Sequence, residues 1–203
     1  MTDFAGAAAA IVGIGRWLDG KGWAPATAGN YSQRLDDGSF AVTVSGRHKG
    51  RLTADDVMRV DAQGAALDGK KPSAETRLHL QLYRLFPGCS AVLHSHSPDA
   101  VGLSRAVTGA AYDLAGHEML KALPGTTTHD TRVSLPIVDN NQDMARLAAA
   151  IEPALLAPDA IPAYLIRSHG LYGWGSDMEE AARVIEAIEW MIAAERAERS
   201  FRV

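Results

Sequence analysis

Cysteine is almost absent from this 203-residue chain, whose only thiol is that of Cys89. A single cysteine cannot form an intramolecular disulfide, so the sequence does not indicate an oxidising compartment. Cys89 follows a Pro87-Gly88 turn and precedes an apolar segment, where we expect a buried, unreactive thiol.

Long apolar runs and a positive charge excess are also lacking. No apolar stretch approaches the roughly 18 residues that a membrane-spanning helix needs, and the alanine-rich segment 5–12 has no basic leader. The formal net charge of -4 does not indicate the concentrated basic face of nucleic-acid binders. We therefore expect a cytoplasmic protein that acts on a small molecule and has neither membrane nor nucleic acid as a partner.

The chain has no Ser/Gly-rich linker, repeat or low-complexity segment, which predicts a single domain over residues 1–203. Apolar periodicity and capping residues predict helices and strands in alternation, and hence an α/β fold with helices covering a sheet. The predicted helices cover residues 4–19, 73–85, 142–156 and 177–198, with a short helix from residue 53 and another from residue 97. The predicted strands cover residues 39–45, 91–96, 133–138 and 163–167.

Two histidines lie at the end of the predicted strand that begins at Ala91. His94 and His96 are two residues apart, so a strand places both imidazoles on one face. Catalytic zinc sites commonly take three protein ligands and leave a position open, and His169, after the apolar segment 163–166, is the best third candidate. The pattern predicts a divalent-metal site, with zinc preferred. Three imidazoles would also accept iron, cobalt, nickel or manganese.

The alternative is that His94 and His96 are surface polar residues after a strand and that His169 is a turn residue, because a His-x-His spacing is common. Three further histidines stand in contexts that favour other roles: His48 in a basic loop, His79 on an exposed helix face, and His129 in a polar threonine-rich stretch.

Two glutamates are candidates for acid/base chemistry. Glu118 lies in an ionisable cluster with His117 and Lys121, and Glu75 lies two residues after Ser73, the predicted helix cap. Either carboxylate could move a proton beside a metal-polarised carbonyl. A glutamate in the first turn of a helix is also favoured by the helix dipole alone, so both positions have a purely structural explanation.

Two loops have the composition of anion sites. The segments 27–30 and 45–47 combine hydroxyl groups with Gly29 and Gly46, which lets backbone N–H groups approach a phosphate. Lys49 and Arg51 add positive charge nearby. Ordinary turns have the same composition, so neither loop is specific by itself.

Taken in order, five short motifs resemble the class II aldolase family over residues 7–198. The resemblance implies a central, largely antiparallel sheet flanked by helices, assembled as a homotetramer with active sites at subunit interfaces. It also implies that His94, His96 and His169 hold one zinc ion per subunit, and that Asn30, Ser45, Gly46 and Ser73 bind the substrate phosphate. The motifs are Gly29-Asn30 with Ser32, Ser45-Gly46, Pro72-Ser73-Ala74-Glu75-Thr76, His94-Ser95-His96 and His169-Gly170.

Within the family, the segments 118–122, 135–140 and 167–175 are most similar to dehydratases of methionine salvage. That similarity implies zinc-dependent dehydration of 5-methylthioribulose 1-phosphate to 2,3-diketo-5-methylthiopentyl 1-phosphate, a lyase reaction. Zinc would bind the ketose oxygens, and Glu118 would take the C3 proton and assist loss of the C4 hydroxyl. The animal-type enzymes carry a cysteine where this chain has Glu75, which instead matches the base position of the aldolases.

Two other functions stay open. A sugar-phosphate aldolase or 4-epimerase of the fuculose or ribulose phosphate type would use the same metal and phosphate sites, with Glu75 as base. A non-catalytic interaction domain of the adducin kind is the other, and the three histidines argue against it.

Overall fold

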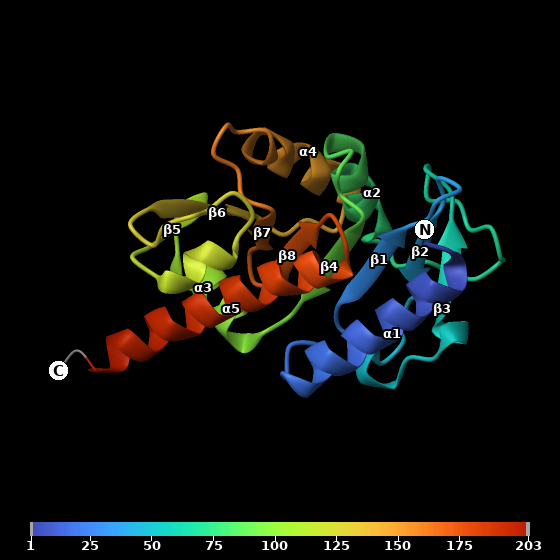
Figure 1. The fold of residues 1–203 in the computed structure, drawn as a ribbon, viewed down its shortest axis with the longest axis horizontal. Coiled ribbons are helices and arrows are strands. Elements are labelled where there is room, and N and C mark those ends of the chain that lie inside the picture. Colours follow the sequence, from blue (N-terminus) through green and yellow to red (C-terminus); the bar gives the residue numbers. More distant parts are fainter. Residues whose placement is uncertain (1, 202–203) are drawn as a thin grey trace.

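The computed structural model describes residues 2–201, which form five α-helices around one eight-stranded sheet (Figure 1). The strand order is β3-β2-β1-β4-β8-β7-β6-β5, and every neighbouring pair is antiparallel except β6 and β7. The strands are β1 Asn30–Arg34, β2 Phe40–Thr43, β3 Val57–Val60, β4 Ala91–Ser95, β5 Ala111–Ala115, β6 Arg132–Val138, β7 Ala163–Ile166 and β8 Gly170–Gly175. The helices are α1 Phe4–Gly20, α2 Thr76–Leu85, α3 Pro98–Ala106, α4 Met144–Leu155 and α5 Met178–Phe201.

The helices form a layer on each face of the sheet. Helices α2 and α4 cover one face, whereas α1, α3 and α5 cover the other, and each face has its own hydrophobic core (Figure 1). This arrangement confirms the predicted α/β class with a largely antiparallel sheet. The prediction of one domain spanning 1–203 stays a prediction, and its ends at residues 1 and 202–203 lie outside the described residues.

The helix boundaries follow from local sequence. Side chains of Asp3, Ser97 and Asp143 accept hydrogen bonds from the first backbone N–H groups of α1, α3 and α4. Pro98 occupies the first turn of α3, where its missing N–H costs nothing. The apolar stripe of α5 is buried against the sheet, as expected for core packing.

One capping prediction is wrong. Ser73 does not cap α2, because the helix begins at Thr76. Instead, the Ser73 hydroxyl accepts a hydrogen bond of 3.3 Å from the backbone N–H of Glu75, and the Ser73 carbonyl accepts one from Thr76. Ser73 therefore shapes a turn before the helix, and this turn places Glu75 beside His94 of β4.

The sequence did not predict four of the strands, namely β1, β3, β5 and β8. Strand β8 has the sequence Gly-Leu-Tyr-Gly-Trp-Gly and is buried on both faces, so it lacks the alternation that marks a half-exposed strand. Two residues of β4 and β8, His94 and Tyr172, are direct cross-strand partners, and Asn30 of β1 pairs with His94 from the other side. These strands thus align functional side chains in one row.

Two predictions from the sequence concern membrane-spanning helices and the environment of Cys89. Among the helices that residues 2–201 form, none combines the length and apolar character needed to span a membrane. Cys89 is buried, as predicted, and burial raises the pKa of its thiol to about 12.

Candidate metal centre and substrate pocket

The three predicted ligands converge in the folded chain. His94 lies near the end of β4, His96 follows that strand, and His169 lies in the turn between β7 and β8. Their ring centroids are 4.5 Å apart for His94 and His96, 4.7 Å for His96 and His169, and 4.9 Å for His94 and His169. One ring nitrogen of each lies within 4.8 Å of the others. The three imidazoles therefore lie close enough together to be candidate ligands of one ion.

The turn that carries His169 depends on close backbone contact. Ser168 adopts a positive φ of 59°, and the His169 N–H closes the turn on the Ile166 carbonyl at 3.0 Å. A Cβ atom on Gly170 would lie 2.1 Å from the carbonyl oxygen of Ser95. Only glycine therefore lets β8 start against the end of β4, and this contact sets His169 beside His94.

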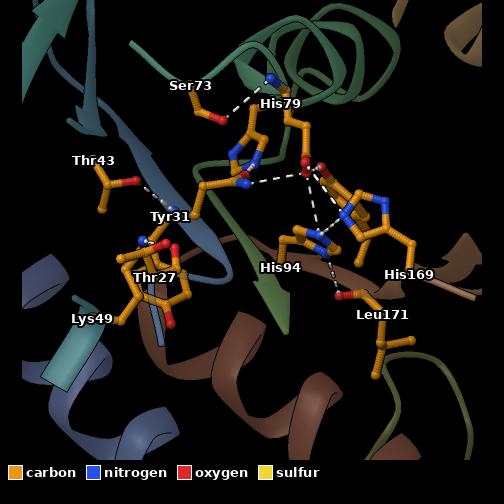
Figure 2. Close-up of polar contacts among 12 residues, drawn as sticks. Thr27, Tyr31, Thr43, Lys49, Ser73, His79, His94, His169 and Leu171 are labelled. Atoms are coloured by element: carbon orange, nitrogen blue, oxygen red, sulfur yellow. Dashed lines mark hydrogen bonds and ion pairs between the residues drawn. The ribbon is translucent and has the colours of Figure 1, made fainter. Parts of the chain in front are cut away.

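The donor set fits a divalent cation. The Nδ1–H of His94 donates to the Leu171 carbonyl at 3.0 Å, which directs the Nε2 lone pair toward His169 (Figure 2). The two Nε2 atoms are 3.4 Å apart. Nitrogens bound at ~2.0–2.1 Å to a tetrahedral zinc would be separated by ~3.3 Å. His94 and His169 therefore already have the spacing of two ligands of one ion, and a ring nitrogen of His96 lies within 4.8 Å of theirs.

Both histidines of the β4 segment are held neutral. Burial lowers the pKa of His94 well below its ordinary value. Burial, reinforced by the nearby His169, lowers the pKa of His96 to about 4. Neutral imidazoles present the lone pairs that a metal requires.

Glu75 lies beside the histidines, a contact that the sequence alone could not predict. Its Oε2 lies 3.2 Å from Nε2 of His94, and its Oε1 lies 3.4 Å from Nε2 of His169. Asn30 donates to Oε2 from Nδ2 at 3.1 Å, and the Tyr172 hydroxyl donates to the same oxygen. Burial opposes ionisation, but the hydrogen bonds from His169 and Tyr172 act against it, and the pKa of Glu75 lies below its ordinary value. The site thus holds a carboxylate against the donor nitrogens.

Tyr172 is a site residue that sequence reasoning missed. Its ring stacks on His94, with centroids 4.1 Å apart and planes inclined by 17°. Its hydroxyl reaches Glu75 at the same time. The available signal was its position three residues after His169, but the contact requires knowing that β8 pairs with β4.

A cavity of about 270 Å³ opens beside the histidines. All four residues predicted to bind phosphate line it, together with Glu75 and His96. The four are Asn30, Ser45, Gly46 and Ser73. The structure therefore brings the two predicted anion loops and one metal-site histidine to a single small cavity.

Lys49 lines the same cavity and has a larger part in it than sequence suggested. The residue is only 2% exposed, and its Nζ donates to the carbonyl of Thr27 at 2.8 Å (Figure 2). The same Nζ donates to the carbonyl of Arg47 at 2.7 Å. Burial lowers its pKa to about 8, while the charge of Glu75 acts in the opposite direction. Lys49 thus links the two loops and places a cation at the cavity.

Glu118 is not brought to the histidines within one chain. It begins the short 3-10 helix Glu118–Ala122, its side chain is 72% exposed, and it is absent from the residues that line the cavity. Its carboxylate accepts a hydrogen bond from Lys121 at 2.6 Å and lies 3.4 Å from His129. The bond from Lys121 lowers the pKa of Glu118.

The prediction that His79 is exposed is wrong. The residue is 2% exposed, because its helix face lies against the sheet rather than the solvent. His129 is exposed, and His48 is half-buried and accepts a hydrogen bond from the Gly50 N–H. These three histidines lie outside the group of possible metal ligands found among residues 2–201.

Comparison with known proteins agrees with this fold. Residues 9–195 match the model of the class II aldolase and adducin N-terminal domain family. The chain is 52% identical to the methylthioribulose-1-phosphate dehydratase of Methylococcus capsulatus over 194 residues, which cover 96% of this chain and 95% of the relative. It is 53% identical to the enzyme of the same name from Pseudomonas paraeruginosa over 186 residues, 91% of each chain.

Among solved structures, the L-fuculose-1-phosphate aldolase of Thermus thermophilus superposes with a TM-score of 0.76 at 28% identity. The superposition covers 96% of this chain and 95% of that one. Since the family model spans nearly the whole sequence and relatives of similar length share half of its residues, the chain belongs to the class II aldolase and adducin family.

Proposed function

We propose that this protein is a lyase that dehydrates 5-methylthioribulose 1-phosphate to 2,3-diketo-5-methylthiopentyl 1-phosphate in methionine salvage. The observation that carries the proposal is the 52% identity, along nearly the full length of both chains, to a methylthioribulose-1-phosphate dehydratase. The histidine cluster with its adjoining cavity supplies the two recognition elements that a ketose phosphate needs, a metal site and an anion site.

The phosphate end of the substrate is assigned to the cavity beside the histidines. Backbone N–H groups near Gly46, together with the side chains of Asn30, Ser45 and Ser73, offer hydrogen bonds to phosphate oxygens. The ammonium of Lys49 adds a charge of opposite sign at short range. Binding of the substrate phosphate in this cavity would fix which carbon of the sugar lies beside the histidines.

His94, His96 and His169 would hold one zinc ion per subunit. When bound, the ion supplies Lewis-acid polarisation of the substrate carbonyl, which acidifies the neighbouring C–H bond. The protein's own contribution is the fixed orientation of the rings, through the Leu171 carbonyl on His94 and the Tyr172 ring stacked on it.

Dehydration requires that the C3–H bond and the C4–O bond both break. A carboxylate accepts the C3 proton, the electron pair forms the C3–C4 double bond, and the C4 hydroxyl leaves as water after it is protonated. The resulting enol then rearranges to the diketone. Glu118 is the proposed acid/base, and Glu75, already beside the histidines, is the second catalytic carboxylate.

Glu118 can take this part only if another subunit carries it to the site, because it is exposed and lies outside the cavity of its own chain. We therefore propose a homotetramer whose active sites combine residues of two subunits. We also propose that it is located in the cytoplasm.

The test is an assay of zinc-loaded protein with 5-methylthioribulose 1-phosphate, in which diketone absorbance is followed. We expect diketone formation that is lost in His96→Ala. Fuculose 1-phosphate, assayed in parallel, tests the second candidate, a sugar-phosphate aldolase. That candidate is favoured by one observation, the contact of Glu75 with His94 and His169. Cleavage of fuculose 1-phosphate without diketone formation would replace the proposed function with the aldolase.

A further inference from the structure

A line of hydrogen bonds runs from Glu75 into the interior behind the cavity. Asn30 donates to Glu75 from Nδ2, and its Oδ1 contacts Nε2 of His79. Nδ1 of His79 lies 2.7 Å from the hydroxyl of Ser32, which in turn lies 2.8 Å from the hydroxyl of Tyr83. These five residues are called the Glu75 chain below. His79 occupies its centre, and none of the catalytic steps proposed above uses it.

Chemistry fixes the direction of every bond in the Glu75 chain. An ionised carboxylate only accepts, so the NH2 group of Asn30 must face Glu75, and its carbonyl must face His79. That carbonyl also only accepts, so Nε2 of His79 must carry the proton. In a neutral imidazole Nδ1 is then the acceptor, and the Ser32 hydroxyl must donate to it.

Burial limits the solvent that could substitute for a missing partner. Asn30, Ser32, His79 and Tyr83 are all buried between β1 and α2. Burial lowers the pKa of His79 to about 4, against the opposing effect of Glu75, so the ring is neutral at physiological pH. His79 also packs edge-on against Tyr172, with centroids 5.6 Å apart (Figure 2 shows His79 above His94). Its ring therefore has one position and one tautomer.

We infer that His79 is a positioning residue of the active site. Ser32 holds it in the Nε2-protonated tautomer, and in that form it orients the Asn30 amide so that the NH2 group fixes the Glu75 carboxylate beside the metal-site histidines. This inference rests on the proposed function for its effect on turnover, but the tautomer itself can be measured independently. If the Glu75 chain only stabilised the fold, folded variants of its residues would keep the wild-type kcat.

The first experiment replaces the group that sets the tautomer. In Ser32→Ala, Nδ1 of His79 loses its donor, so the Nδ1-protonated form becomes accessible. That form turns a lone pair toward the Asn30 carbonyl and disfavours the amide orientation. We expect 15N NMR of histidine-labelled protein to show the Nε2-protonated tautomer in the wild type and a mixture in Ser32→Ala. The kcat for dehydration should fall about tenfold, a change of ~1.4 kcal/mol in the barrier, at unchanged zinc content.

A second pair of variants gives the answer if Ser32→Ala does not fold. His79→Gln keeps an N–H at the position of Nε2, whereas His79→Leu removes it. We expect the kcat of His79→Gln to be at least tenfold higher than that of His79→Leu, provided that the two folded variants are equally stable. Tyr164→Phe, which removes a buried hydroxyl from the same face of the sheet, is the control and should keep wild-type kcat.

Three outcomes would overturn the inference: an Nδ1-protonated His79 in the wild type, equal turnover of His79→Gln and His79→Leu, or full turnover of a Ser32→Ala protein whose tautomer has shifted. If the wild type forms no diketone, the proposed function fails instead, and the NMR measurement still reports whether Ser32 sets the tautomer of His79.

Discussion

The hydroxyl of Ser95 donates a hydrogen bond of 2.9 Å to Glu189, a buried carboxylate of α5. Ser95 lies between His94 and His96, and its side chain points to the opposite face of the sheet from theirs. Glu189 also accepts a hydrogen bond from Ser97, whose hydroxyl in turn accepts one from the first turn of α3. One carboxylate thus joins α5, the cap of α3 and the strand end that carries two metal-site histidines.

The burial of Glu189 predicts a stability that depends on pH. Burial raises its pKa to about 7, against the hydrogen bonds from Ser97 and Ser95. The native state therefore binds a proton at Glu189 that the unfolded state has already released, and the stability contributed by this group is lost as pH rises from about 4.5 to about 7. The loss is on the order of 3 kcal/mol. Urea unfolding at pH 5 and pH 8 should measure it.

Glu189→Gln isolates this effect from that of other titrating groups, because an amide does not ionise. We expect its stability to change less between the two pH values than that of the wild type. Glu186→Gln, at a half-exposed position one turn earlier on the same helix, should behave as the wild type. Equal pH dependence in Glu189→Gln and the wild type would show that Glu189 is not the responsible group.

The histidine cluster predicts metal binding that depends on each ring. His169→Ala should reduce zinc from about one ion per chain to below about a tenth, because only two of the three ligands remain. Elemental analysis after dialysis measures the content, and circular dichroism checks the fold. His129→Ala removes an exposed histidine outside the cluster and should retain the full zinc content. Zinc retained in both variants would contradict the site.

A shared active site predicts complementation between two inactive variants. His96→Ala lacks a ligand and Glu118→Gln lacks the proposed acid/base, so each tetramer alone should be inactive. After unfolding and refolding of an equal mixture, about a quarter of the sites would combine an intact cluster with an intact Glu118 from a neighbour. Diketone formation at roughly that fraction of wild-type activity is the expected result. An inactive mixture of well-formed tetramers would argue against a catalytic role for Glu118 across the interface.

Lys49 is expected to act on substrate binding. Lys49→Met removes the cation from the cavity, so KM should rise about tenfold, as expected for loss of a charge-assisted hydrogen bond to phosphate. Lys70→Met is the matched control, since Nζ of Lys70 also donates to two carbonyls, those of Asp55 and Val57, but Lys70 does not line the cavity. If both variants raise KM equally, the effect comes from loop stability rather than from charge at the site.

The resemblance to class II aldolases could be found in the sequence because its motifs are short and local. Two histidines at i and i+2 after an apolar segment indicate a common face without any knowledge of the partner strand. Gly29 and Gly46, in loops rich in hydroxyl groups, likewise indicate anion sites wherever those loops lie. These features supplied the candidate metal ligands, which the fold brings together, and the candidate phosphate-binding residues, which line one cavity.

Contacts between strands distant in sequence could not be found in this way. The row that Asn30, His94 and Tyr172 form exists only because β1, β4 and β8 are neighbours in a fixed register. The burial of His79 follows similarly from the packing of α2 on β1, which its helical neighbours do not reveal.

The sequence by itself determined which side chains are candidates to bind a metal and a phosphate, because ligand type and turn composition are local properties. Only the tertiary structure decided that Glu75 lies against His94 and His169, that Tyr172 stacks on His94, and that Glu118 is exposed and does not line the cavity of its own chain. The physical reason is that strand order and register are set by burial of the whole sheet between two helical layers, and no short segment encodes them.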